Sequence, residues 1–210
     1  MRKTFARLLC LIIFMGGILS QLFAQSPADS ALAARKAMFQ KMEPLMVFPV
    51  AKGSALTGAI QVDSVTEDID AKATYKILFD FTQGSMPAYS KGIVNDGVEE
   101  IVRMVNLHRA AGVKPEKLQV VVVVHSAAVL SVLNESAYQQ KFNRTNPNAA
   151  LIRQLQEAGA HFVVCGQTMK LRGLNNFELI PGVKKAFSAR TALSTYVGKG
   201  FVTFAIADAK

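Results

Sequence analysis

The sequence predicts an α/β protein whose parallel sheet is covered by helices on both faces. Strand-like and helix-like segments alternate from residue 74 to residue 206. Residues 118–124 include five consecutive valines, which is typical of a strand buried on both faces. Half of the 210 residues are hydrophobic and 19% are charged, as in a globular domain with a substantial core. Parallel strands need crossover helices, so this alternation favours a helix-covered parallel sheet.

The first 24 residues carry the pattern of a secretory signal peptide. Arg2, Lys3 and Arg7 form a basic start, an apolar run follows over 8–19, and Ala24 is small enough for a cleavage site. The apolar run is shorter than the roughly 20 residues that span a bilayer. We therefore expect cleavage near residue 24, a periplasmic or secreted mature protein, and no stable membrane insertion after cleavage.

Residues 25–72 are expected to form an N-terminal helical arm and a connector. Ser26 followed by Pro27 is typical of a helix start, and the helix is expected over 26–42. The connector, 43–72, contains prolines and glycines and is expected to be irregular. The α/β domain then occupies 73–210.

The first half of the domain is read from its caps and apolar spacing. A strand is expected at 74–81. Asp96 and Glu99 have the spacing of a capping box, which predicts that a helix begins there, and Gly112 ends that helix. The valine strand, 118–124, comes next.

The second half begins with a helical region that is interrupted near Pro147. Asn148 is expected to cap a helix that Gly159 closes. The remaining elements expected are a strand ending at Cys165, a short strand over 183–187, a helix capped by Ser188, and a last strand over 201–206.

Cys165 is the candidate nucleophile. The chain has two cysteines, and Cys10 leaves with the signal peptide. Gly166 ends the strand, which places Cys165 at the carboxyl edge of the sheet, where open α/β proteins bind ligands. The start of a following helix would favour a thiolate there. Cys165 as a small, inert core residue is the alternative, and position alone leaves both open.

His125 is the candidate partner of Cys165, because it ends the preceding strand. If the two strands are neighbours, the two side chains share one crevice, and His125 would exchange protons with the thiol or stabilise the thiolate. The alternative is a histidine that only bonds the backbone of a loop. Candidates for holding an anionic substrate are Ser126, Gln167, Thr168 and Lys170; their alternative roles are capping and a solvated face.

Several classes of function are disfavoured. No C-x-x-C pair is present, the three histidines and single mature cysteine lack metal-ligand spacing, and no nucleotide-binding glycine loop is found, so we expect no metal and no cofactor. The formal charge is +9, and losing three basic residues with 1–24 leaves +6. This charge is spread along the chain, so nucleic-acid binding is not expected.

Taken in order, several segments resemble the DsrE/DsrF-like family over about residues 73–208. The segments are 121–126, Asn148 with Leu151 and Leu155, 163–168, and 180–183. The resemblance implies a three-layer sandwich with a five-stranded parallel sheet in the order 4-3-2-1-5. It also implies a trimer or hexamer. In sulfur-relay members one cysteine, here matched by Cys165, accepts sulfur as a persulfide and passes it to a partner protein.

This chain departs from the relay proteins in three ways: an export signal, no second cysteine, and an added arm. The expected function is an exported protein that handles sulfur through one reactive cysteine, with a sulfur donor or acceptor protein as partner. The alternative is a non-catalytic module that binds a small ligand or partner, or a structural oligomer, with Cys165 buried and unreactive. Enzymatic activity is left open.

Overall fold

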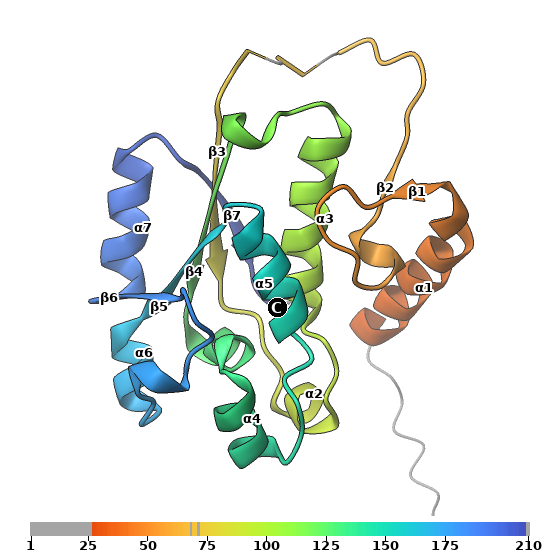
Figure 1. The fold of residues 1–210 in the computed structure, drawn as a ribbon. Coiled ribbons are helices and arrows are strands. Elements are labelled where there is room, and N and C mark those ends of the chain that lie inside the picture. The colour runs from red at the N-terminus through yellow and green to blue at the C-terminus, as the bar shows by residue number, and fades with distance from the viewer. Residues whose placement is uncertain (1–26, 68, 71, 209–210) are drawn as a thin grey trace, which may run out of the picture.

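The computed structural model describes residues 27–67, 69, 70 and 72–208. Its centre is a five-stranded sheet, all parallel, in the order β6 (Lys184–Ala186), β5 (His161–Cys165), β4 (Leu118–Val124), β3 (Tyr75–Phe81) and β7 (Val202–Ile206) (Figure 1). Counted along the chain within this sheet, the order is 4-3-2-1-5, so the expected topology is confirmed. The expected signal peptide, 1–24, lies outside the described residues.

Helices cover both faces of the sheet. Helices α3 (Asp96–Ala110) and α5 (Ala149–Glu157) pack on one face, and α7 (Ala189–Gly198) packs on the other (Figure 1). Three short helices, α2 (Met86–Lys91), α4 (Glu135–Phe142) and α6 (Gly166–Leu171), lie toward the carboxyl ends of the strands. The three-layer α/β sandwich is therefore confirmed.

The two faces of the sheet differ in their cores. The face under α3 and α5 carries a large buried cluster that includes Phe79, Val122 and Phe162. The face under α7 carries a small one, built around Leu78 and Val123. Because side chains alternate along a strand, the valine run supplies both clusters, which is why it has no polar face.

The two edges of the sheet also differ. The β6 edge carries the exposed Lys184 and Lys185. The β7 edge exposes uncharged residues instead, with Val202 and Phe204 among the large hydrophobic side chains that stay accessible to solvent.

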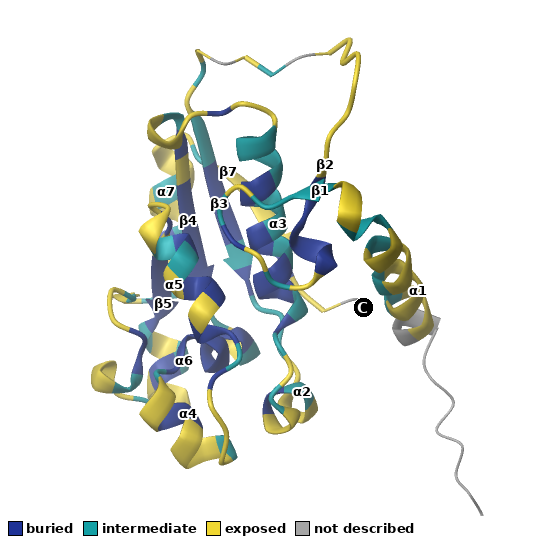
Figure 2. Ribbon diagram, turned by 45° about the vertical axis from the view of Figure 1, so that its right-hand side comes forward, coloured by how far each residue is buried: buried dark blue, intermediate teal, exposed yellow. Residues whose placement is uncertain are grey.

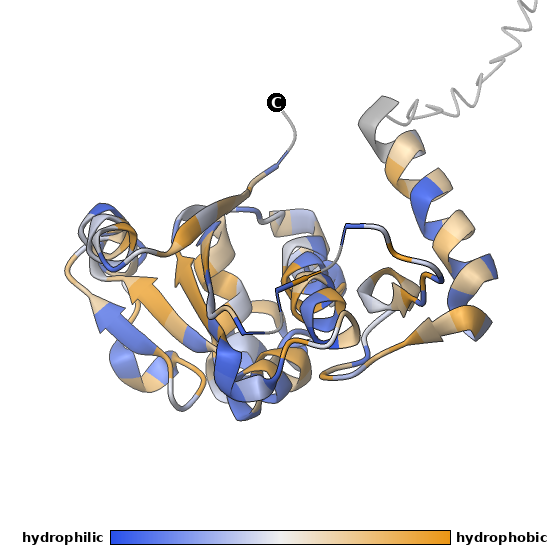
Figure 3. Cartoon of the chain, turned by 90° about the horizontal axis from the view of Figure 1, so that it is seen from above, coloured by the Kyte–Doolittle hydropathy of each residue, from blue (hydrophilic) through white to orange (hydrophobic). Residues whose placement is uncertain are grey.

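The N-terminal arm consists of α1 (Pro27–Met42), the 3-10 turn η1 (Glu43–Leu45), β1 (Met46–Val47), the 3-10 turn η2 (Ala55–Thr57) and β2 (Ala59–Ile60). Strands β1 and β2 pair antiparallel, so the connector is more regular than expected. Most of α1 is exposed, in contrast to the buried central strands (Figure 2). From above, α1 stands apart from the sheet, and the apolar colours concentrate on the strands (Figure 3).

Asn106, fully buried in α3, fastens the arm to the domain. Its side-chain amide donates to the carbonyls of Ala51 and Thr57 at 2.8 and 2.7 Å, and its oxygen accepts from the Val50 N–H at 2.8 Å. A buried amide with all these bonds made holds a loop that has few regular partners of its own.

Two expected caps are wrong. Asn95, one residue earlier than expected, caps α3 by accepting from the Gly97 N–H at 2.7 Å, while Glu99 accepts from the Ser54 N–H instead of closing a capping box. Asn148 makes no side-chain cap on α5, because its oxygen accepts from the Asn95 N–H at 2.8 Å. In both cases a buried polar group is satisfied by a distant segment rather than by its own helix.

The other elements agree with expectation to within a residue or two at their ends, as is usual for boundaries drawn from sequence. Turns η3 (Pro115–Lys117), η4 (Ser126–Val132) and η5 (Asn176–Glu178) complete the chain. Across the part of the chain that the structure describes, no helix combines the length and the hydropathy of a membrane span.

Candidate functional site

Cys165 is the last residue of β5 and the N-cap of α6. It belongs to the small core cluster under α7 and is only 5% exposed. The strand ends here because Gly166 packs against the backbone of β6: a Cβ on Gly166 would lie 2.7 Å from the Ala186 carbonyl oxygen. A side chain at 166 would therefore push β5 and β6 apart next to the thiol.

Beside Cys165, the connections that follow the neighbouring strands β5 and β6 cover opposite faces of the sheet. The segment after β5 packs on the α3 and α5 face, where Met169, Leu179 and Ile180 join the large cluster. The helix after β6, α7, covers the other face. Such a point, where neighbouring strands send their connections to opposite faces, is where open α/β sheets form ligand crevices.

Hydrogen-bond donors converge on the Cys165 sulfur from two helix starts. The Thr168 N–H lies 3.4 Å from Sγ, and the N–H groups of Gln167 and Ala189 and the Thr168 hydroxyl also donate to it. Burial raises the pKa of Cys165, but these four donors together outweigh burial and hold the pKa below the ordinary thiol value.

Thr168 also links the site to the neighbouring strand. Its hydroxyl oxygen accepts from the Ser126 N–H at 3.4 Å, so it relays between the loop after β4 and the Cys165 sulfur. Ser126 has a positive φ of 57°, a conformation that aims this N–H toward α6. The structure thus brings Ser126, Thr168 and Cys165 together.

His125 pairs with a residue that the sequence interpretation missed. Its Nε2 lies 2.7 Å from Oδ1 of Asp80, near the end of β3. By strand register, Asp80, His125 and Cys165 follow Leu78, Val123 and Val163 on the α7 face, on three neighbouring strands. Among the described residues, no hydrogen bond joins His125 to Cys165, so the shared crevice stays a prediction.

Gln167 and Lys170 point elsewhere. The Gln167 side chain donates to the Phe187 carbonyl at 3.3 Å, so only its backbone N–H serves the thiol. Lys170 is exposed on α6. Further exposed basic residues follow Lys170 along the chain, after α6, on β6 and at the start of α7: Arg172, Lys184, Lys185 and Arg190.

The profile of the DsrE/DsrF-like family matches residues 88–204, more than half of the chain. The chain belongs to the DsrE/DsrF-like family. This family is associated in general with sulfur relay. No curated protein matches the sequence.

A solved structure similar to this chain is that of MTH1491, a protein of unknown function from Methanobacterium thermoautotrophicum. The sequence identity is 16% and the TM-score is 0.45. The match covers 63% of this chain and 99% of the other.

The range matched by the DsrE/DsrF-like family contains His125, Ser126 and the Cys165 region, whereas Asp80 and the arm precede it. Within the described residues, no group of three or more His, Cys, Asp or Glu side chains is arranged to hold a metal ion. Two cavities of about 530 and 680 Å³ lie away from Cys165, between the arm and the start of α3.

Proposed function

We propose that this DsrE/DsrF-like protein carries sulfur on Cys165 as a persulfide. The observation that carries the proposal is the set of donors on the Cys165 sulfur from Thr168, Gln167 and Ala189, which lowers the pKa of the thiol despite its burial. A thiolate is the nucleophile in sulfur transfer, so a lowered pKa increases the reactive fraction at neutral pH.

The transfer is a displacement at sulfur. The Cys165 thiolate attacks the outer sulfur of a donor persulfide; the new S–S bond forms as the donor's S–S bond breaks, and the donor leaves as a thiolate. An acceptor thiolate then attacks the outer sulfur on Cys165, which restores the Cys165 thiolate. No net oxidation occurs, and both leaving groups are stabilised as thiolates.

The neighbouring groups have distinct roles in this proposal. The N–H groups that hold the Cys165 thiolate also hold it when it leaves. Asp80 fixes the orientation of His125, which would add positive charge beside the crevice when protonated. Exposed Lys170 on α6 and Lys185, whose side chain lies beside Gly166, favour an anionic sulfur species or an acidic face on the donor or acceptor protein.

Intact-mass spectrometry of the mature protein after exposure to polysulfide tests the proposal. We expect a gain of one sulfur atom that a reductant removes, and no gain in Cys165→Ala. Unmodified protein, in a sample whose free thiol is shown to be intact, would contradict it.

One observation favours a second candidate, a non-catalytic binding module or structural oligomer. Cys165 is only 5% exposed, as expected for an inert core cysteine. Iodoacetamide separates the two candidates: labelling of the folded protein at neutral pH supports sulfur transfer, and labelling only after denaturation supports the second candidate.

Export and assembly complete the proposal. The mature protein would begin near residue 25 in the periplasm, as the pattern of residues 1–24 favours. N-terminal sequencing of the periplasmic fraction checks this. Copies would form a trimer or hexamer, which light scattering at micromolar concentration checks; a monomer would count against it.

A further inference from the structure

Two adjoining cavities lie where the arm crosses the start of α3. Their volumes are about 530 and 680 Å³. Both are lined by Lys36 of α1, Leu56 of η2, Ile93 and Val94 before α3, and Glu99 in the first turn of α3. Because the shared wall comes from both parts, the space exists only where the arm is docked on the domain.

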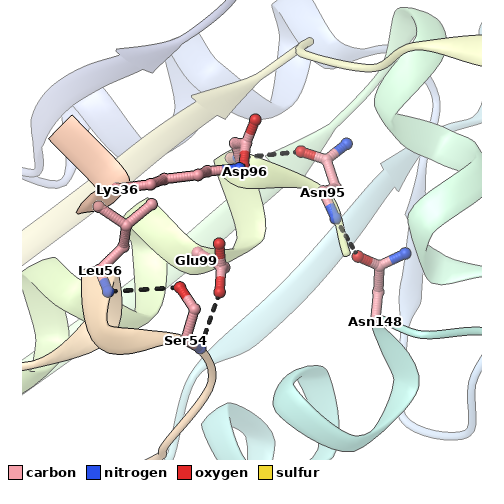
Figure 4. A network of polar contacts seen from close by, with 8 residues as sticks. Lys36, Ser54, Leu56, Asn95, Asp96, Glu99 and Asn148 are labelled. Atoms are coloured by element: carbon pink, nitrogen blue, oxygen red, sulfur yellow. Dashed lines mark hydrogen bonds and ion pairs between the residues drawn. The ribbon is translucent and has the colours of Figure 1, made fainter. Parts of the chain in front are cut away.

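Glu99 is a buried carboxylate with one oxygen left without a donor. The residue is only 6% exposed, and Oε1 accepts from the Ser54 N–H at 2.9 Å. Among the described residues, Oε2 accepts no hydrogen bond. Figure 4 shows the carboxylate between η2 and the first turn of α3, with Lys36 extending past it to Asp96. Oε2 is not among the buried polar atoms that lack a partner in the described residues, so it is accessible from the cavity and open to a donor from a bound molecule.

The cationic side chains that line the cavities are already paired with other carboxylates. Lys36 Nζ lies 2.7 Å from Asp96, and Arg35 lies 3.0 Å from Glu100. The third, Lys52, lies 2.8 Å from Glu43. Glu99 therefore faces the cavity without a cation of its own.

The rest of the smaller cavity's lining is largely apolar, whereas polar and apolar side chains line the larger cavity about equally. Leu56, Ile93 and Val94 line both cavities, and Leu151 of α5 lines the smaller one. In the smaller cavity the apolar wall ends at Glu99, the one carboxylate among its described lining residues. This arrangement suits an amphipathic molecule, since the wall takes the chain and the charge fixes the head group.

We propose that the smaller cavity binds a small molecule with a protonated amine and a short apolar chain. The ammonium group donates to Oε2 of Glu99, and the chain lies against Leu56, Ile93 and Val94. This site is separate from Cys165 and does not depend on sulfur transfer. It also assigns a role to the arm, which builds one wall of the site.

Probes that share one chain and differ in the head group test the proposal. Hexylammonium, hexan-1-ol and hexanoate are titrated into the mature protein and followed by amide NMR. Hexylammonium should bind saturably, with roughly millimolar affinity for so small a ligand. The shifted amides should belong to η2 and the start of α3, and hexan-1-ol and hexanoate should bind at least about tenfold more weakly.

Glu99→Gln is the deciding variant, because glutamine retains an oxygen for the Ser54 N–H and loses only the charge. It should weaken hexylammonium binding by about tenfold. Glu116→Gln, an exposed change on η3 beyond the far end of α3, is the matched control and should leave affinity unchanged. Cys165→Ser should also leave it unchanged, which separates this result from the sulfur proposal.

Ile93→Trp gives a second, independent variant. Ile93 is partly exposed and precedes α3, so a larger ring there fills the cavity without disturbing the core, and it should abolish binding. Equal affinity for all three probes, or full affinity in either Glu99→Gln or Ile93→Trp, would overturn the proposal.

Discussion

Cys165 and Glu99 are both buried acceptors at the start of a helix, but the chain supplies them differently. The Cys165 sulfur receives donors from Thr168, Gln167 and Ala189. Glu99 receives one N–H, from Ser54, and keeps its second oxygen for the cavity. Several hydrogen-bond donors around Cys165 stabilise an anion that the protein itself forms, the thiolate. The lack of a donor on the second oxygen of Glu99 leaves that oxygen free to bind a cation from solution. Both residues lie at the start of a helix, so this position does not distinguish their roles. The number of hydrogen-bond donors that each receives does.

The largest expected effect is the loss of the sulfur acceptor. Cys165→Ser should abolish persulfide formation while the domain stays folded, because serine keeps the volume and accepts the same N–H groups. Mass spectrometry after polysulfide exposure measures the loss, and far-UV circular dichroism checks the fold. Because Cys165 is the one cysteine after residue 24, the fold is the part of this prediction that can fail: loss of the far-UV signal in Cys165→Ser would contradict it.

Asn95→Ala should destabilise the start of α3, the helix whose first turn carries Glu99. Asn95 caps α3 and its amide donates to the Gln83 carbonyl at 2.9 Å and to the Tyr89 hydroxyl at 2.8 Å. We expect a loss of about 2 to 3 kcal/mol in the free energy of unfolding, measured in urea. Asn134→Ala removes a half-buried cap on α4 together with a single bond to the Phe177 carbonyl, and should cost about 1 kcal/mol. Equal losses would show that the buried network adds nothing to the cap.

Thr168→Val should raise the pKa of Cys165, because it removes the hydroxyl that donates to the sulfur and leaves the N–H groups in place. The alkylation rate with iodoacetamide, measured against pH, should shift its midpoint upward by roughly half a unit to one unit. Thr203→Val, an exposed change on β7, should leave the midpoint in place. An unmoved midpoint in Thr168→Val would assign the lowered pKa to the backbone donors.

The same lowered pKa predicts a dependence of stability on pH. The folded-state pKa of Cys165 lies below its unfolded value, near 8.5 for a free thiol, so ionisation favours the folded state. This contribution should be fully present above about pH 8.5 and should disappear as the pH falls through the folded-state pKa. Subtracting the urea stability of Cys165→Ala from that of the unsubstituted protein across this range isolates it; a flat difference would contradict the lowered pKa.

The smallest effect is expected from the His125 and Asp80 pair. His125→Asn should slow alkylation of Cys165 by about threefold, because it removes the ring that exchanges protons beside the crevice, and Asp80→Asn should slow it less, because it frees the orientation of that ring. If the two residues act as a unit, the double variant should be no slower than His125→Asn alone. Asp63→Asn, an exposed change in the connector, serves as the control.

Much of the fold follows from local patterns. The run from Val120 to Val124 can only be buried on both faces, and Gly166 marks the end of β5 because a side chain there would meet β6. The strand order came from the family resemblance, since alternation alone does not rank neighbours. Local patterns thus correctly placed Cys165 where β5 ends, at the carboxyl ends of the strands.

The rest of the site depends on distant partners. Asp80 interrupts the apolar second half of β3, which was a usable signal, but its bond to His125 spans 45 residues. Glu99 looked like half of a capping box because its true partner, Ser54, is equally far away in sequence. Such contacts are set by tertiary packing, which no short window of sequence contains.

The unequal edges of the sheet bear on whether copies of this protein can join edge to edge into fibres. An open-ended stack of sheets needs one molecule's β7 edge to join the next molecule's β6 edge, and to repeat. The β6 edge is three residues long and carries Lys184 and Lys185, which oppose such joining. Two β7 edges that met each other would instead use up both open edges and stop. The lysines on one edge thus make the longer, uncharged edge safe to leave exposed.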